Sequence, residues 1–337
     1  MGDARKTKKQ KLGRRLLTWW PSRLLIELWV WGLATFMTLP GPRWAYFWAR
    51  VMARVGWVVL PRVRGVILRN LDLCLPELSE TERTRIGRES LKHNIYTFLD
   101  LLLVPRYFTG ECWREYVHMV GDCDKFFAWL KQPKSSFNMS AHFGNWELLL
   151  GVTGKHGVGY SVIVRPPNLP LVAKWLERYR KFASCELIDK EGALKALLHR
   201  IRQNKPVALM ADQNGGDFAP VMPFFGVPAR WQTEFSRLVP RADGRVAFGY
   251  TVRHGDKFEF DFHEPEMHEF KQDVTPEQIM EVYRKWLEAR IREHPEQYFW
   301  MHKRFKGRPK GAPDRYADLG RRLSADARAK LIVVQPQ

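Results

Sequence analysis

The sequence predicts an α/β protein, in which a mixed, mostly buried β-sheet is flanked by helices. The chain has 337 residues, of which 45% are hydrophobic, enough for one large α/β domain with an added helical region. After Pro133, short apolar runs alternate with amphipathic segments, whereas before it apolar residues follow helical spacing. We expect a basic N-terminus with a membrane-anchoring helix over 1–42, a helical region over 43–130, an α/β domain over 131–315 and a tail over 316–337.

The N-terminal apolar stretch predicts membrane attachment. It runs from Leu16 to Leu39, and about 24 residues are enough to cross a bilayer core, which needs roughly 20. Because basic residues precede it, we expect a cytoplasmic N-terminus. Because no small-residue cleavage site follows it, we expect an uncleaved anchor. Pro21, Arg23 and Glu27 interrupt the run, so a helix lying in the membrane interface is the alternative. Tryptophan favours this boundary, and six of the 14 lie nearby: Trp19, Trp20, Trp29, Trp31, Trp44 and Trp48.

The region that follows is expected to be helical. Ser79 and Glu82 form a capping box, which marks the start of a helix. Apolar residues at mostly three- and four-residue spacing continue to Leu102. The helix is expected to end before Pro105, because the residue that precedes a proline disfavours helical geometry.

The segment after Pro133 predicts strands and two further helices. Thr275 as the N-cap and Pro276 in the first turn predict a helix that ends before Pro295, and an amphipathic helix is expected around 194–201. Short apolar runs are typical of buried strands. They cover 136–140, 160–164, 207–211, 246–252 and 258–262.

Net charge indicates anionic partners. The chain carries 55 Lys and Arg against 36 Asp and Glu, a formal charge of +19. Seven basic residues and one acidic residue lie in the first fifteen positions, which leaves +13 for the remainder. A positive field attracts anionic lipids, acidic proteins or nucleic acid. Nucleic acid is disfavoured as a partner, because no recognition motif is present and basic residues are not interleaved with aromatic ones.

Cysteine spacing indicates neither a disulfide framework nor a metal site. The chain has four cysteines, with no C-x-x-C pair and no histidine at zinc-finger spacing. We therefore expect a reducing compartment, no metal and no cofactor.

A polar motif between a strand and a helix carries the candidate chemistry. His142 follows the apolar run 136–140, with Gly144 supplying flexibility and Asn145 as a helix cap. Glu147 in the first helical turn is then able to fold back to the imidazole. A carboxylate on one ring nitrogen fixes the tautomer and leaves the other nitrogen free to accept a proton. A buried histidine paired with a carboxylate only for packing is the alternative.

The motif His142-Phe-Gly-Asn-Trp-Glu147 resembles the H-x-x-x-x-[DE] signature of glycerolipid-type acyltransferases. In its wording it resembles the bacterial lipid A secondary acyltransferases, which add laurate or myristate. Further matches follow in the same order and, together with the motif, span most of the chain from about residue 66 onward. They are 165–170, 189–192, 211–213, 223–229 and 295–306.

The resemblance implies roles for individual residues. His142 is expected to be the general base and Glu147 its partner. Arg180 and Asp212 match the family's essential arginine and aspartate and are expected to form a charge pair that shapes the site or touches an acceptor phosphate. A solvated helix face is the alternative for Arg180. The other candidate substrate-binding residues are Arg165, Asn145, Gln213, Phe224 and Phe225, of which the two phenylalanines are expected to line an acyl groove or else to belong to the core.

The activity implied is transfer of a fatty acyl chain from acyl carrier protein, as co-substrate, to a hydroxyl of a lipid A precursor. Acyl carrier protein is acidic, so the basic chain offers it a docking surface, and the same charge suits an anionic lipid or glycolipid acceptor. The expected location is the bacterial inner membrane, with the active site on the cytoplasmic side.

Two other functions stay open. The segment 233–242 departs from the family pattern, so the acceptor differs in the first alternative. That acceptor is another lyso-lipid or an amine, such as an ornithine-, glycine- or mannoside-type lipid, and acyl-CoA is the alternative donor. A non-enzymatic basic protein that binds membranes or nucleic acid is the alternative from another class. It predicts salt-sensitive binding that survives loss of His142 and Glu147.

Overall fold

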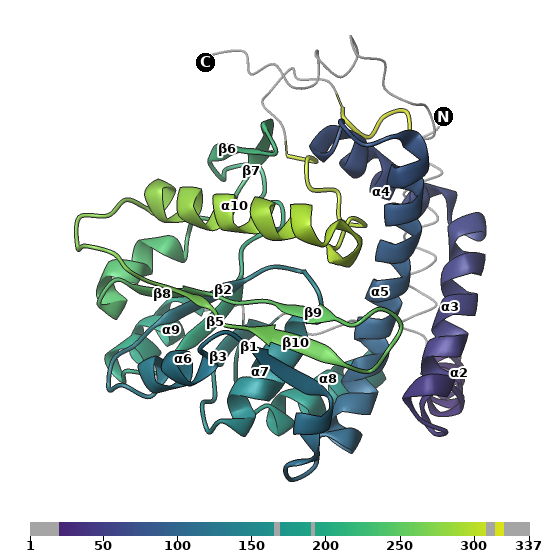
Figure 1. Cartoon of the computed structure of the whole chain (residues 1–337), viewed down its shortest axis with the longest axis horizontal. Helices are drawn as coiled ribbons and strands as arrows, with labels where there is room; N and C mark the ends of the chain where they lie inside the picture. The colour runs from purple at the N-terminus through teal and green to yellow at the C-terminus, as the bar shows by residue number, and fades with distance from the viewer. Residues whose placement is uncertain (1–19, 165–168, 190–192, 308–313, 320–337) are drawn as a thin grey trace.

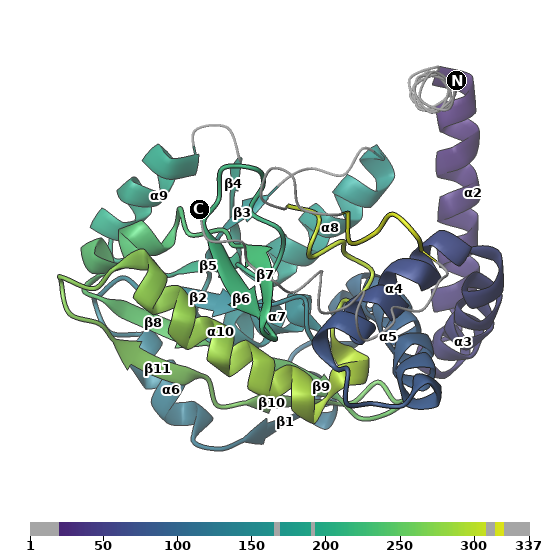
Figure 2. The ribbon, with the colours of Figure 1, turned by 90° about the horizontal axis from the view of Figure 1, so that it is seen from above.

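The computed structural model describes residues 20–164, 169–189, 193–307 and 314–319 (Figure 1). Four helices open this part of the chain, and three of them begin with proline in the first turn or follow a side-chain cap. The first, α2, extends away from the body beside α3 (Figure 2). They are α2 (Trp20–Thr38), α3 (Pro42–Val59), α4 (Pro61–Cys74) and α5 (Glu80–Tyr107).

The predicted membrane-spanning anchor is not supported. Within the described ranges, no helix has the length and apolar character that a membrane crossing requires. The N-terminal helix α2 is 19 residues long and contains both Arg23 and Glu27. These two charges lower the mean hydropathy of the helix, which accounts for the difference. Residues 16–19 of the predicted anchor lie outside the described ranges.

Helix α5 confirms the predicted capping box and corrects the predicted helix end. The Ser79 hydroxyl accepts from the backbone N–H of Glu82, whose carboxylate accepts from the N–H of Ser79. The helix continues past Pro105 to Tyr107. Proline lies in the last turn, where one lost N–H costs little, and Phe108 N still donates to Val104 O at 2.8 Å.

The main sheet is mixed and buried, as predicted. Its six strands have the order β11-β8-β2-β5-β3-β4. Strand β2 is central and runs parallel to both β5 and β8, and only the edge strand β11 is antiparallel to its neighbour. The strands are β2 (Phe137–Ser140), β3 (Ser161–Val164), β4 (Glu186–Asp189), β5 (Val207–Met210), β8 (Arg245–Phe248) and β11 (Glu266–Glu269).

Helices cover both faces of this sheet. One hydrophobic cluster joins Met139 of β2 to α9 and α10, and the other joins Ala208 of β5 to α6, α7 and α8. Figure 1 shows α10 crossing one face, with α6, α7 and α8 on the opposite side. The helices are α6 (Cys123–Leu130), α7 (Trp146–Lys155), α8 (Pro170–Phe182), α9 (Ala193–Arg202) and α10 (Pro276–Glu293). Helix α10 begins with the predicted Thr275 cap and ends before Pro295.

Two smaller sheets complete the described structure. The run 246–252, predicted as one strand, is divided between β8 and β9, which lie in different sheets because the chain turns at Gly249 and Tyr250. The region expected to be helical contributes strand β1, which pairs with β10. The three-stranded sheet consists of β1 (Val117–Val120), β10 (Phe260–His263) and β9 (Thr251–Arg253), and a hairpin joins β6 (Val221–Phe224) to β7 (Val227–Arg230).

Candidate active site

Two side chains meet where neighbouring parallel strands end. His142 lies two residues after β2, and Asp212 lies two residues after β5. Strands β2 and β5 are paired in parallel, so their carboxyl ends lie at the same edge of the sheet. This is where open α/β sheets place functional groups.

Asp212 holds His142 by two hydrogen bonds. Its Oδ1 lies 2.8 Å from ring Nδ1 of His142, and its Oδ2 accepts from the backbone N–H of His142 at 3.0 Å. Because a carboxylate accepts but does not donate, Nδ1 carries the proton in the neutral ring. Ring Nε2 is therefore the nitrogen with a lone pair, as a general base requires.

The Asp212 charge also sets the protonation of the site. Burial by itself lowers the pKa of His142, but Asp212, together with the Glu147 charge, outweighs burial and raises that pKa above its ordinary value. Burial by itself would raise the pKa of Asp212, and the charge and hydrogen bonds of His142 lower it instead. The pair thus favours an ionised carboxylate beside an imidazole of increased basicity.

Glu147 does not make the predicted hydrogen bond to His142. It lies in the first turn of α7, and its Oε1 is 3.3 Å from Nη2 of Arg180 on α8. The expected charge pair between Arg180 and Asp212 is not formed either. Arg180 is bound to Glu147, and Asp212 is bound to His142. The reason is the helix start: Asn145 caps α7, and Glu147 then faces α8 rather than the turn.

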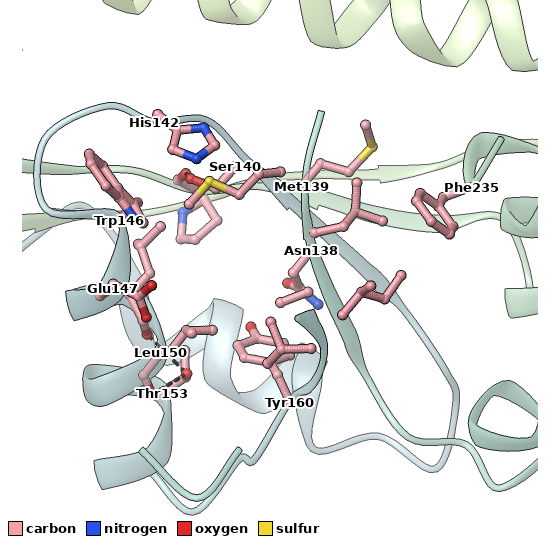
Figure 3. A pocket seen from close by; sticks show the side chains of 18 of the residues that line it. Asn138, Met139, Ser140, His142, Trp146, Glu147, Leu150, Thr153, Tyr160 and Phe235 are labelled. Carbon is pink, nitrogen blue, oxygen red and sulfur yellow. Dashed lines mark hydrogen bonds between the residues drawn. The ribbon is translucent and has the colours of Figure 1, made fainter. Parts of the chain in front are cut away.

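A cavity of about 410 Å³ opens beside these residues. In Figure 3 His142, Trp146 and Glu147 lie along one side of it, Phe235 lies at the other side and Tyr160 at its base. Strand β2 contributes Asn138 to its wall, and the residues paired with Asn138 on both neighbouring strands are alanines, which leave space. Apolar side chains dominate the lining, among them Leu149, Leu150, Val162, Ile163, Leu209, Met210 and Phe262.

The other predicted site residues are distributed differently. Gln213 lines the cavity, and its Nε2 lies 3.2 Å from Nε2 of His142, where the amide donates to the neutral ring. Asn145 is buried away from the cavity lining. Phe224 is buried in the core and Phe225 lies beside Glu288 and Arg292, so neither lines the cavity. The predicted Arg165 lies outside the described residues.

Several parts of the site were missed by sequence reasoning. Phe126, Tyr160 and Phe262 line the cavity from segments that were read only as helix or strand. Asp100, one charge within the apolar run 98–104, was a usable signal, because a charge at a buried helix position needs a partner. In the portion of the chain that the structure describes, no group of three or more metal-ligating side chains is found.

Comparison with known proteins identifies the family. The family model for bacterial lipid A biosynthesis acyltransferase matches residues 15–307. A lipid A biosynthesis palmitoleoyltransferase of Escherichia coli K12 is 27% identical over 321 residues, covering 90% of this chain and 95% of the relative. A lipid A biosynthesis lauroyltransferase of the same organism is 26% identical, covering 76% and 83%. One lipid A biosynthesis acyltransferase of Haemophilus influenzae is 26% identical, covering 75% and 82%. The chain is therefore an O-acyltransferase that belongs to the bacterial lipid A biosynthesis acyltransferase family.

Proposed function

We propose that this enzyme transfers a fatty acyl chain from acyl carrier protein to a hydroxyl of a lipid A precursor, with His142 as the general base. The observation that carries the proposal is the His142–Asp212 pair at the wall of a mainly apolar cavity. It supplies an oriented base next to a space suited to a fatty chain, and each buried methylene contributes about 0.8 kcal/mol. The names of the relatives support the acceptor class.

The chemistry follows from the orientation of the ring. Nε2 of His142 takes the proton of the acceptor hydroxyl while its oxygen attacks the thioester carbonyl. The C–O bond forms and the carbonyl electrons move to oxygen. When the tetrahedral intermediate collapses, the C–S bond breaks and the thiolate takes the proton from the imidazolium. Asp212 stabilises the imidazolium between these steps, as the carboxylate of a catalytic triad does.

Glu147 and Arg180 complete the proposed site. Glu147 acts on His142 through its charge, which adds to the basicity that Asp212 provides. Arg180 lines the same cavity, and its Nη2 lies 3.3 Å from Oε1 of Glu147. Because this guanidinium keeps donors beyond the one bound to Glu147, it is suited to a phosphate of the acceptor or donor. Gln213 would release Nε2 when the acceptor hydroxyl takes its place.

Membrane attachment is proposed through an interfacial surface. Helices α2 and α3 expose large apolar side chains, among them Leu25 at 68%, Trp29 at 67% and Val58 at 68%. Exposed apolar surface of this kind marks a membrane or protein contact, and tryptophan favours the headgroup region. With a formal charge of +19, the chain would bind the anionic cytoplasmic leaflet of the inner membrane, and the acidic carrier protein by the same field.

One observation favours a second candidate acceptor. The segment 233–242, which departs from the family pattern, includes Phe235, and Phe235 lines the cavity together with neighbouring Gln232. A change at this wall alters what the site accepts. The second candidate is therefore the same transfer to another lipid hydroxyl or amine, with acyl-CoA as a possible donor.

Reconstitution tests these alternatives directly. The purified enzyme is mixed with acyl carrier protein or CoA carrying the same acyl chain, and with a lipid A precursor, a lyso-ornithine lipid or a lyso-phospholipid. Products are identified by mass spectrometry. We expect one added acyl group on the lipid A precursor, a preference for the carrier-protein donor, and loss of product in His142→Ala. Product only on another acceptor, or only from CoA, would replace the corresponding part of the proposal.

A further inference from the structure

We infer that Asp100 and Arg253 are positioning residues for catalysis, which hold the turn containing His142 through the side chain of Asn145. The inference rests on the proposed role of His142 as the base. Neither residue lines the cavity, so any effect on the reaction is exerted through the turn 142–145.

The two residues form an ion pair in the interior. Asp100 on α5 is 1% exposed and Arg253 on β9 is 3% exposed. Arg253 Nη2 donates to Oδ2 of Asp100. The same Oδ2 accepts from Nδ2 of Asn145 at 2.7 Å, and Oδ1 accepts from the hydroxyl of Tyr46 at 2.6 Å.

The bond from Asn145 to Asp100 fixes which way the amide faces. A carboxylate accepts hydrogen bonds, so the amide nitrogen of Asn145 must face Asp100. Its Oδ1 then faces α7, where it accepts from the backbone N–H of Leu148 at 3.1 Å and forms the N-cap. Asp100 thereby sets the start of the helix that follows His142 and carries Glu147.

Arg253 holds the same turn a second time through its main chain. Its N–H donates to Oε1 of Gln297 at 2.9 Å, and its carbonyl accepts from Nε2 of Gln297 at 3.0 Å. The carbonyl of Gln297 in turn accepts from the N–H of Gly144 at 2.9 Å. The hydroxyl of Thr251, on the same strand as Arg253, contacts both N and O of Asn145, at 3.2 and 2.9 Å.

Gly144 shows how closely the turn is held. Its φ of +57° favours glycine, and a Cβ at this position would lie 1.8 Å from the carbonyl oxygen of Thr251. The turn thus packs directly against β9. A buried ion pair adds little stability compared with apolar side chains of similar volume. The role assigned to this pair is therefore the orientation of the Asn145 side chain.

The decisive variant keeps the cap and removes only the contact to the ion pair. Serine is as good an N-cap as asparagine but is too short to replace the amide bond to Asp100, so Asn145→Ser separates the two functions. Tyr46→Phe is the matched control, because it removes one hydrogen bond to Asp100 and one from Arg253 without touching the turn. Turnover, thermal unfolding and the pKa of His142 by NMR are measured for each.

We expect Asn145→Ser to lower kcat about 10- to 100-fold at unchanged KM for the donor. We expect the pKa of His142 to fall as well, because a displaced ring loses part of its contact with Asp212. Tyr46→Phe should keep kcat within about twofold. An Asn145→Ser enzyme with unchanged kcat and unchanged His142 pKa would overturn the inference. A loss of activity equal to the loss of folded protein in the thermal unfolding measurement would also overturn it.

A second variant tests the inference if Asn145→Ser folds poorly. The double substitution Asp100→Asn with Arg253→Met removes both buried charges together, so no unpaired charge stays in the core. It is expected to lower kcat and the His142 pKa in the same direction, and an unchanged pKa would count against the inference. Failure of the proposed function is distinguishable, since it appears as turnover that survives His142→Ala while the pKa effect of Asn145→Ser persists.

Discussion

The carboxylate of Asp212 binds His142 at two points, with Oδ1 2.8 Å from the ring Nδ1 and Oδ2 3.0 Å from the backbone nitrogen. The two residues are 70 positions apart in the chain and meet because β2 and β5 are adjacent and parallel. Asp212 therefore fixes both the position of the residue and the tautomer of its ring. The proposed mechanism depends on this contact more than on the charge of Glu147.

The Glu147–Arg180 pair is predicted to couple energetically. In a double-mutant cycle of Glu147→Gln and Arg180→Gln, we expect a coupling of roughly 0.5–3 kcal/mol in the free energy of unfolding, because both side chains are largely shielded from water. The matched control is Glu177→Gln with Lys181→Gln, an exposed pair on the same helix, whose coupling should be close to zero. Equal coupling in the two cycles would show that the first pair is also solvated.

Two glycines with positive φ should respond differently to alanine. Gly144→Ala is expected to unfold the turn or abolish transfer, because its Cβ meets the Thr251 carbonyl. Gly157 at the end of α7 also has a positive φ, of +80°, but nothing lies within 4 Å of its Cβ position. We expect Gly157→Ala to cost only about 1 kcal/mol and to keep activity. Circular dichroism melting and turnover measure both variants, and a harmless Gly144→Ala would contradict the packing described here.

Chain-length selectivity is predicted to change at Ala208. This residue lies in β5 and lines the cavity, and Ala208→Leu reduces the space available. Each methylene that no longer fits loses about 0.8 kcal/mol, or roughly fourfold in kcat/KM. Donors of increasing length are compared in competition. Short donors serve as the internal control, because their rates should stay near those of the native enzyme, and a uniform loss at all lengths would argue against an acyl cavity.

The exposed faces of α2 and α3 are predicted to bind membranes. The double substitution Leu25→Glu with Trp29→Glu should lower binding to anionic vesicles by at least about tenfold, since both side chains are more than half exposed. Leu194→Glu on α9 is the control, because it adds a charge at another exposed leucine away from these helices. Sedimentation with vesicles measures the effect, and equal binding by the two proteins would contradict an interfacial surface on α2 and α3.

Local signals predicted the elements of the fold well. The capping box at Ser79 and the N-cap at Thr275 are formed as expected, because their partners lie three residues away. The apolar runs at 137–140 and 207–210 are strands, because buried strands leave a continuous apolar pattern. Strands β1, β4, β6, β7 and β11 were missed, since a polar residue or a proline interrupts the apolar pattern of each.

The pairing within the site was less predictable. The resemblance selected His142, Glu147, Arg180 and Asp212 as a set, and the structure brings all four to one end of the sheet. The sequence favoured pairing His142 with Glu147 because they are near in the chain. His142 pairs with Asp212 instead because β2 and β5 are adjacent, and the order of strands in a sheet cannot be predicted from individual apolar runs. The partners of Asp100 were hidden for the same reason, since Arg253 lies on a distant strand.

The pH dependence of kcat/KM, measured for the native enzyme and for Asp212→Asn, tests whether Asp212 activates His142. A general base must be neutral, so activity falls as pH drops through the pKa of His142, which Asp212 raises. For Asp212→Asn we expect a plateau rate lower by roughly 10²–10⁴-fold and a midpoint shifted to lower pH. A midpoint that does not move, or activity close to the native level, would contradict the claim that Asp212 activates His142.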